Sequence, residues 1–117
     1  MYCNIKAAGI YLIEIGDYYY LGMSVDIFGR WKSHYTSLKL GKHHSPKLQE
    51  MFNEFGLEGM SFKVLEYISI TEFRKVSKKK GKALTDEFRK HLLIREKYWM
   101  SNYSINFSLN ASNKNFG

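Results

Sequence analysis

Hydrophobic and polar positions alternate near the start of the chain, over Gly9–Ile15 and again over residues 18–21. Alternation with a period of two is typical of β-strands, and Gly16 and Asp17 between the two segments suit a tight hairpin turn. A two-residue turn also fixes which residues lie opposite one another: Ile15 and Tyr18, Ile13 and Tyr20, and Tyr11 and Gly22. The first 22 residues therefore predict a β-hairpin with a defined register.

This hairpin carries four tyrosines, and the register separates them. Opposed residues share a face of a sheet, so Tyr11 and Tyr20 are expected diagonally on one side. Tyr19 points to the other side with Leu12 and Leu21, and we expect Tyr18 and Tyr19 to serve the hairpin and the core. Aromatic residues are common in strands, so the tyrosines alone do not indicate a site.

A helical pattern follows from residue 25 to about residue 40, with Ser24 as its expected N-cap and Gly41 placed to end it. Arg30 and His34 are four residues apart on the border of its apolar side and can reach a common point. Polar residues border most amphipathic helices, so this position is also ordinary. The apolar side is formed by Ile27, Phe28, Trp31, Tyr35 and Leu38.

The next segment predicts a loop and a short helix. His43 and His44 lie in the loop, where adjacent histidines are expected to point apart, and no spaced partner completes a zinc set. Ser45 is the expected cap and Pro46 the first residue of the helix, which Gly56 ends. The inward side chains are expected to be Leu48, Phe52 and Phe55.

Alternation returns over residues 61–68 and predicts a third strand with Phe62, Val64, Glu66 and Ile68 on one face. A helical pattern then begins at Thr71, is interrupted by a basic and mobile insertion at residues 74–82, and resumes as a long helix from about Thr85 to Tyr103. The tail alternates again at Ile105, Phe107 and Leu109, which predicts a short strand or extended segment. The elements together predict an α+β fold with a small antiparallel sheet of three strands.

The composition fits one domain spanning residues 1–117, because 44% hydrophobic and 25% charged residues are ordinary globular usage. Eighteen Lys and Arg against 11 Asp and Glu give a net charge of +7, which favours polyanionic partners such as nucleic acid, although excess charge also serves solubility. Cys3 is the only cysteine, which excludes an internal disulfide and fits a reducing compartment. No segment approaches the roughly 20 apolar residues that span a bilayer, so we expect a cytoplasmic protein with no membrane partner.

Glu96 is the most informative single residue, because it falls in the middle of the apolar stripe of the last helix. A buried, unpaired carboxylate costs several kcal/mol, so Glu96 must be protonated, paired with a cation or bound to a metal ion. A salt bridge with Arg89, with Lys97 or with an arginine of another helix is the alternative. Two phenols, a guanidinium, imidazoles and one core-side carboxylate in a basic domain supply the roles that phosphodiester cleavage needs.

The same residues carry a resemblance to a known family. "GIY" at 9–11 followed by "YLG" at 20–22 resembles the paired motif of the GIY-YIG nucleases. The resemblance continues through "DIFGRWKSHY", "GKHHSPKLQEMFNEFG", "FKVLEYI" and "REKYWM", so it covers nearly the whole chain. Eight residues separate the two motifs, fewer than the family commonly has, and the basic insertion is a second departure.

The resemblance implies a small central sheet flanked by three to five helices, and hydrolysis of DNA with one divalent ion, Mg²⁺ or Mn²⁺. A single ion also agrees with the residues, because two-metal sites need several converging carboxylates. By resemblance, Glu96 is the metal ligand, Arg30 stabilises the transition state, and Tyr11 is the first candidate for the base or water-orienting group. Tyr20 would lie next to Tyr11, His34 would relay or donate protons, and His43 and Asn106 complete the expected catalytic set.

The expected substrate is double-stranded DNA, held at its phosphates by the basic insertion: Arg74, Lys75, Lys78, Lys79, Lys80 and Lys82. The resemblance extends to homing and other phage-type endonucleases, and the chain could be the catalytic domain of such an enzyme, acting in the host cell of a phage or in an organelle. A non-catalytic nucleic-acid-binding relative and a structural RNA- or protein-binding adaptor are the alternatives. The sequence leaves open whether the protein is a monomer or a dimer.

Overall fold

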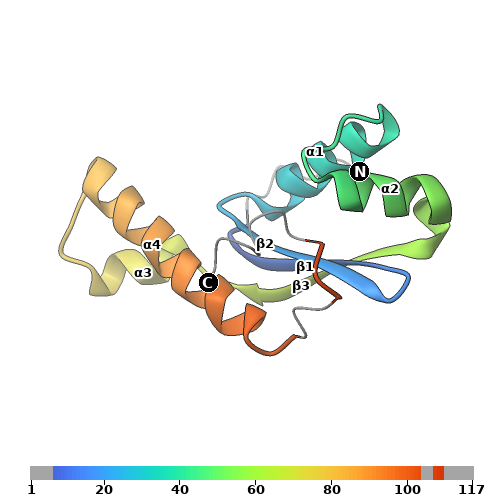
Figure 1. The fold of residues 1–117 in the computed structure, drawn as a ribbon. Helices are drawn as coiled ribbons and strands as arrows, with labels where there is room; N and C mark the ends of the chain where they lie inside the picture. Colours follow the sequence, from blue (N-terminus) through green and yellow to red (C-terminus); the bar gives the residue numbers. More distant parts are fainter. Residues whose placement is uncertain (1–6, 104–106, 110–117) are drawn as a thin grey trace.

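The computed structural model describes residues 7–103 and 107–109, and within them it has three strands and four α-helices around one sheet (Figure 1). The sheet is antiparallel with strand order β2-β1-β3. This confirms the α+β class and the three-stranded sheet. In chain order the elements are β1 (Gly9–Ile15), β2 (Tyr18–Ser24), α1 (Ile27–Lys39), α2 (Pro46–Phe55), the 3-10 turn η1 (Leu57–Gly59), β3 (Met60–Tyr67), α3 (Ile70–Val76) and α4 (Gly81–Met100).

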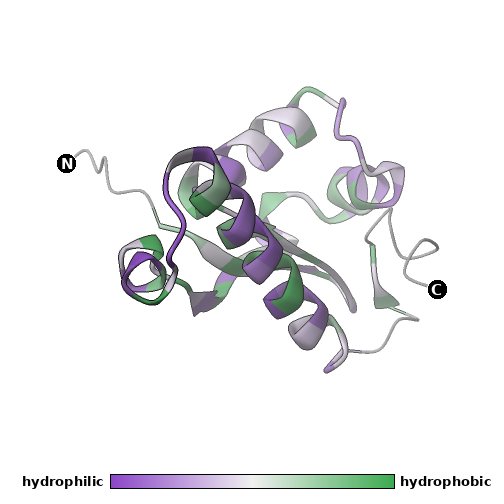
Figure 2. Ribbon diagram, turned by 90° about the vertical axis from the view of Figure 1, so that its left-hand side faces the viewer, coloured by the Kyte–Doolittle hydropathy of each residue, from purple (hydrophilic) through white to green (hydrophobic). Residues whose placement is uncertain are grey.

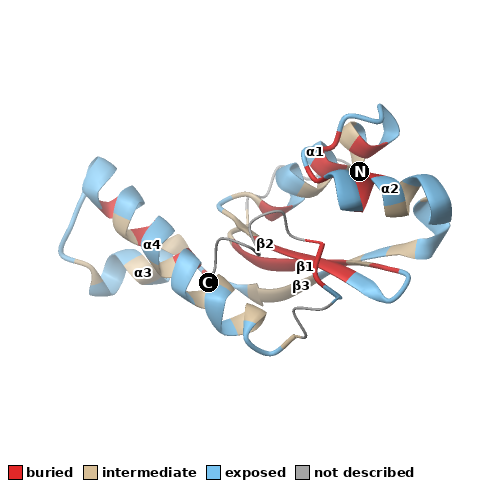
Figure 3. Ribbon diagram, viewed as in Figure 1, coloured by how far each residue is buried: buried red, intermediate tan, exposed pale blue. Residues whose placement is uncertain are grey.

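The hairpin has the register that its two-residue turn dictates. Ile15 pairs with Tyr18, Ile13 with Tyr20, and Tyr11 with Gly22. β1 is the central strand and is almost wholly buried, as Figure 3 shows in red. The predicted pairing is therefore confirmed.

Helices cover both faces of this sheet and form two cores. On one face, α1 and α2 pack against a cluster that includes Tyr11 and Tyr20; on the other, α3 and α4 pack against a cluster that includes Tyr19. The predicted separation of the tyrosines is confirmed. None of the helices within the described ranges combines the length and the apolar composition needed to cross a membrane.

The start of α1 differs from the prediction. Asp26, not Ser24, is the N-cap, because its Oδ1 accepts a hydrogen bond from the Gly29 N–H at 3.2 Å. The Ser24 hydroxyl instead accepts a hydrogen bond from the Asp26 N–H at 2.9 Å, just before the first residue of the helix. Phe28, predicted to face inward, is 45% exposed, because α1 buries the side formed by Ile27, His34 and Leu38 and Phe28 is turned about 100° away from Ile27.

α2 begins and ends as predicted, with Ser45 as its N-cap, Pro46 in its first turn and Gly56 at its end. Phe55 was expected inside but is 43% exposed, since it lies in the last turn of α2, where its ring reaches only the hairpin turn at Gly16.

β3 contains an irregularity that the alternation does not show. Tyr11 pairs with Val64 but Ile10 pairs with Glu66, so Leu65 is an extra residue, as in a β-bulge. After the bulge the side chains change faces: Phe62 and Val64 pack in the Tyr11 core, whereas Glu66 bonds residues of α4 and Ile68 packs in the core of α4. The prediction that Glu66 and Ile68 share a face with Phe62 and Val64 is therefore wrong.

The basic insertion is mostly helical, which corrects the predicted boundaries. Residues 74–76 complete α3, Gly81 and Lys82 begin α4, and only residues 77–80 connect the two helices. Figure 2 shows this connection as hydrophilic, and in Figure 1 it projects away from the sheet. At the other end, α4 stops at Met100 rather than Tyr103, because Ser101 Oγ and Asn102 Nδ2 both donate to the Tyr98 carbonyl.

The described part of the tail runs beside the hairpin. Ser108 forms a parallel bridge with Tyr19, and the Leu109 N–H donates to the Tyr19 carbonyl at 2.6 Å. Leu109 is buried, whereas Phe107 is exposed and contacts Tyr18. Ile105 and Asn106 lie outside the described residues.

Candidate active site

Two phenols lie on the α1 side of the hairpin, and a glycine of each motif gives the site its shape. Gly22 faces Tyr11, and a Cβ at Gly22 would lie 2.5 Å from Tyr11 Oη. A Cβ at Gly9 would overlap the carbonyl oxygen of Glu66 on β3. The absence of side chains at these positions lets the ring of Tyr11 lie across β2 and lets β3 approach β1.

A chain of hydrogen bonds runs from Tyr11 into the interior. Tyr11 Oη lies 2.7 Å from His34 Nε2, and His34 Nδ1 lies 2.7 Å from His43 Nε2. The Ser45 N–H then donates to His43 Nδ1 at 2.9 Å. Tyr20 Oη lies 3.0 Å from the Nε2 of His44, so each phenol has an imidazole partner.

The three histidines form one compact group. The rings of His43 and His44 are stacked with centroids 4.4 Å apart, and those of His34 and His43 are stacked at 4.9 Å. The expectation that His43 and His44 point apart is therefore wrong. Gln49 explains part of this arrangement, because its Oε1 accepts the His43 main-chain N–H at 3.0 Å and holds the loop against α2.

Burial keeps these imidazoles neutral at neutral pH. Desolvation, then the charges of His43 and Arg30, lowers the pKa of His34 to about 3. Desolvation and then the charge of His44 lower the pKa of His43 to about 4. The pKa of His44 is also lowered, by burial and by Arg30.

Arg30 acts on both phenols from α1. Burial lowers the pKa of Arg30, but its hydrogen-bonding interactions with Tyr11 and Tyr20 outweigh that effect and raise it. Burial is the main reason why the pKa of each phenol lies above its ordinary value, and Arg30 opposes this in both. At neutral pH both phenols are therefore protonated in the free protein.

Glu96 approaches the phenols from α4 on the other side of the sheet. Burial raises the pKa of Glu96, with Lys97 opposing, and the charge of Glu96 adds to the raised pKa of both Tyr11 and Tyr20. Within residues 7–103 and 107–109, Glu96 makes no hydrogen bond or ion pair, so the predicted alternative of a salt bridge with Arg89 or Lys97 is absent there.

The donor set decides which metal could fit. No group of three His, Cys, Asp or Glu side chains among the described residues could enclose an ion. A half-buried carboxylate without a protein partner suits Mg²⁺, which commonly keeps several waters and binds one or two carboxylates together with substrate phosphates. Glu96 therefore fits a magnesium ion of this kind and does not fit a site formed by protein ligands alone.

Comparison with known proteins finds endonuclease domains with the same fold. No protein-family model matches the chain. The catalytic domain of the homing endonuclease I-TevI aligns with a TM-score of 0.66 and 27% identity, over 89% of this chain and 97% of that domain. A mutant of the catalytic domain of intron endonuclease I-TevI aligns with a TM-score of 0.60 and 26% identity, over 82% of each chain. The chain has the fold of a GIY-YIG nuclease domain.

The sequence resemblance to the GIY-YIG family is thus confirmed, and a curated relative adds to it. Intron-associated endonuclease 1 of Enterobacteria phage T4 is 41% identical over 51 residues, which are 42% of this chain and 21% of the phage protein. The match therefore spans about a fifth of that relative.

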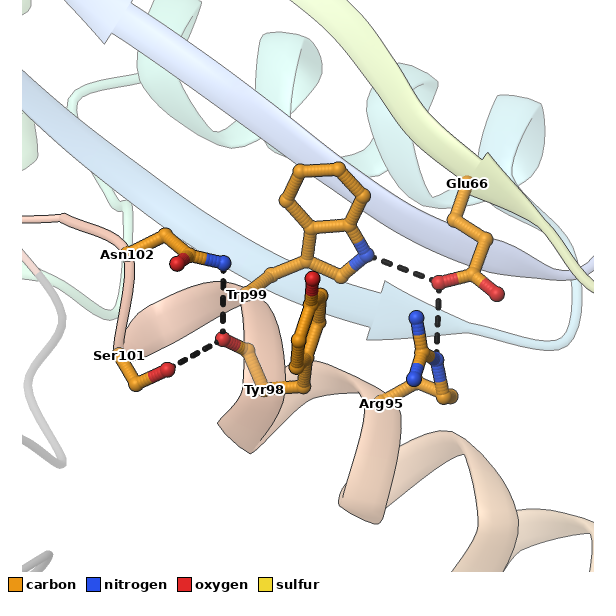
Figure 4. Close-up of polar contacts among 6 residues, drawn as sticks. All are labelled: Glu66, Arg95, Tyr98, Trp99, Ser101 and Asn102. Carbon is orange, nitrogen blue, oxygen red and sulfur yellow. Dashed lines mark hydrogen bonds and ion pairs between the residues drawn. The ribbon is translucent and has the colours of Figure 1, made fainter.

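Glu66 is a residue that sequence reasoning missed in this GIY-YIG fold. Its Oε1 accepts hydrogen bonds from Arg95 Nε at 2.9 Å and Trp99 Nε1 at 2.8 Å (Figure 4). These contacts join the last turns of α4, where Glu96 lies, to β3. Arg95 is also seated over the Tyr98 ring, 4.4 Å from its centroid. The β-bulge that turns Glu66 toward α4 has no signal in the alternation of the strand.

The predicted DNA-binding residues lie at the projecting end of the α3–α4 pair. Three of them are in exposed ion pairs: Lys75 with Glu72, Lys79 with Glu87 and Lys82 with Asp86. The other three are Arg74, Lys78 and Lys80, which are exposed. The structure brings together Tyr11, Tyr20, Arg30, His34, His43 and Glu96 as one site and places this basic end apart from them, while Asn106 is outside the described residues.

Proposed function

We propose that the chain is a metal-dependent DNA endonuclease that hydrolyses phosphodiester bonds. The observation that carries this proposal is that the Arg30 guanidinium and the Glu96 carboxylate, which has no partner among the described residues, both lie close enough to act on the same two phenols. The endonuclease relatives support the same function, because the alignment covers 97% of the I-TevI catalytic domain.

The chain's own residues would divide the work of hydrolysis. Arg30 offers fork-like donors beside Tyr11 and Tyr20, where the negative charge of a pentavalent phosphorus centre could be stabilised. Tyr11 would position the attacking water or accept its proton. Because burial raises the pKa of Tyr11, positioning the water is the role that fits the free protein, and a base role requires bound substrate and cation to lower that pKa.

Glu96 would hold the divalent ion, Mg²⁺ or Mn²⁺. When bound, this ion supplies charge neutralisation at the scissile phosphate. Desolvation of Glu96 favours cation binding, because a half-buried carboxylate gains more from an opposite charge than a solvated one.

The substrate would be double-stranded DNA inside a cell, and the function of a homing or phage-type enzyme is part of the proposal. Lys78 and Lys80 make no ion pair within the described part of the chain and would be free to contact phosphates. Changing both to glutamine should lower the slope of log affinity against log salt by about 2, at roughly 0.9 per contact. Lys63→Gln, at a lysine paired with Glu14 on the sheet, is the control and should leave the slope unchanged.

Incubation of supercoiled plasmid with the protein and Mg²⁺ tests the enzymatic function. Wild type and Lys32→Ala, an exposed neighbour on α1, should cleave, whereas Arg30→Ala should lose about 100-fold or more in rate. DNA binding without cleavage under any divalent ion would instead support a non-catalytic nucleic-acid-binding protein.

Single-turnover rates separate the phenols. Tyr11→Phe should be slowed far more than Tyr20→Phe, because Tyr11 is the hydroxyl held by the buried histidine chain. A near wild-type rate in Tyr11→Phe would remove Tyr11 from the chemistry.

A further inference from the structure

The hydrogen-bonded chain that ends at Ser45 has a direction, and one contact determines it. A main-chain N–H can only donate, and its hydrogen is fixed by the planar peptide. The Ser45 N–H points at His43 Nδ1, 2.9 Å away. His43 Nδ1 therefore carries no proton, and the neutral ring must carry its proton on Nε2.

The same reasoning assigns the proton of the His34 ring. His43 Nε2–H donates to His34 Nδ1 at 2.7 Å, so His34 Nδ1 is an acceptor and the His34 proton is on Nε2. His34 Nε2–H then donates to Tyr11 Oη, also at 2.7 Å. A second proton on His43 would set its Nδ1–H against the Ser45 N–H, and a second proton on His34 would set its Nδ1–H against the His43 Nε2–H.

We propose that the Ser45 main-chain N–H is a positioning group that fixes the tautomers of His43 and His34, so that Tyr11 Oη accepts a hydrogen bond from His34 and cannot pass its proton to it. The hydroxyl hydrogen of Tyr11 therefore points away from His34. One lone pair of Oη accepts from His34 inside the protein, the Arg30 guanidinium, which can only donate, lies on the same oxygen, and the O–H is left for the substrate side.

The surrounding groups are consistent with this direction. The Arg30 guanidinium on α1 opposes a positive charge on either ring, and His44 does so when it is itself protonated. Burial lowers the pKa of both rings, to about 3 for His34 and about 4 for His43, so both are neutral at pH 7. Ser45 is itself held in place, because its hydroxyl caps α2 and donates to the Leu109 carbonyl at 2.9 Å.

The fixed tautomers also limit the role of His34 in the proposed nuclease, a step that rests on the proposed function. Of the two roles open to His34, relaying a proton from Tyr11 and donating to Tyr11, only the second agrees with the fixed tautomers. His34 would then hold Tyr11 Oη in place and stabilise negative charge that develops there.

Nitrogen-15 NMR of the histidine rings at pH 7 reads the tautomers directly. In wild type, His34 and His43 should each be protonated at Nε2 alone. His43→Gln offers an N–H to His34 Nδ1 and should leave His34 protonated at Nε2, whereas His43→Glu offers only an acceptor and should move a proton to His34 Nδ1. Tyr11→Phe should not change the His34 tautomer, since the direction is set at the Ser45 end.

Protonation of His34 at Nδ1 in wild type, an unchanged ring in His43→Glu, or a tautomer reversed by Tyr11→Phe would each overturn the proposal. The spectra do not depend on cleavage. Correct tautomers in a protein that cuts no DNA would leave this inference standing and refute the nuclease function instead.

Discussion

A single methyl group at Gly22 should disrupt the centre of the site. Gly22 lies opposite Tyr11, and a Cβ there would lie 2.5 Å from Tyr11 Oη and 2.6 Å from Cζ. Gly22 has no positive φ, so the backbone itself accepts alanine. The clash with the phenol alone therefore decides the effect of Gly22→Ala.

The size of the effect follows from the space available. An ordinary contact needs 3.4 Å, so Tyr11 Oη must retreat by about 0.9 Å, yet the ring is buried and packs against Phe62 at 5.6 Å between centroids. Overpacking of this kind costs about 1–3 kcal/mol of unfolding free energy. The retreat also breaks the 2.7 Å contact with His34, and a displacement of about 1 Å can cost about 100-fold in rate.

A double-mutant cycle in urea measures this cost. In a Tyr11→Ala background the clash is gone, so Gly22→Ala should be neutral or stabilise by up to about 1 kcal/mol, because alanine loses less backbone entropy than glycine. The reasoning is refuted if Gly22→Ala costs the same in both backgrounds, or costs nothing in the wild type.

Three further predictions concern charge and anchoring. Because the folded-state pKa values of His34 and His43 are about 3 and 4, the unfolded chain binds protons first, and stability should fall from about pH 6.5 to 4 by up to about 1.4 kcal/mol per pH unit for each histidine; urea midpoints that stay flat over this range would contradict it. Glu96→Gln should raise the unfolding free energy at pH 7 by about 1 kcal/mol, because it removes a desolvated charge, while slowing cleavage by about 100-fold or more; a loss of stability in urea would show that Glu96 is paired. Glu66→Leu should lower the unfolding free energy by about 1–3 kcal/mol and slow cleavage, since it leaves the Trp99 N–H without its acceptor. Glu66→Gln keeps an acceptor and should lower the unfolding free energy less; equal losses in the two variants would contradict the role of the two hydrogen bonds.

The sequence was sufficient for the parts of the fold that depend on local rules. The two-residue turn at Gly16 and Asp17 fixed the whole register of the hairpin, including Tyr11 opposite Gly22. The 3.6-residue period of the last helix placed Glu96 on its inward side. These features were predictable because the turn and the helix period act within a few residues.

Features that depend on tertiary contacts were not predictable. The bulge at Leu65 turns Glu66 toward α4, and the alternating pattern of β3 does not predict this bulge. The stacking of His43 on His44 depends on Gln49 and on the cap of α2, which are set by packing of the helix on the sheet. The helical ends of the basic segment were hidden because its lysines mask the apolar period.

Cleavage by wild type and Glu96→Gln over a magnesium series tests the central claim most directly. Wild type should cut supercoiled plasmid only when the divalent ion is present, and Glu96→Gln, which keeps the shape of the side chain but not its charge, should be slower by about 100-fold or more at every concentration. Equal rates in the two proteins, or no cleavage by wild type with any divalent ion, would contradict the claim that the inward carboxylate, the guanidinium and the phenols form a nuclease site.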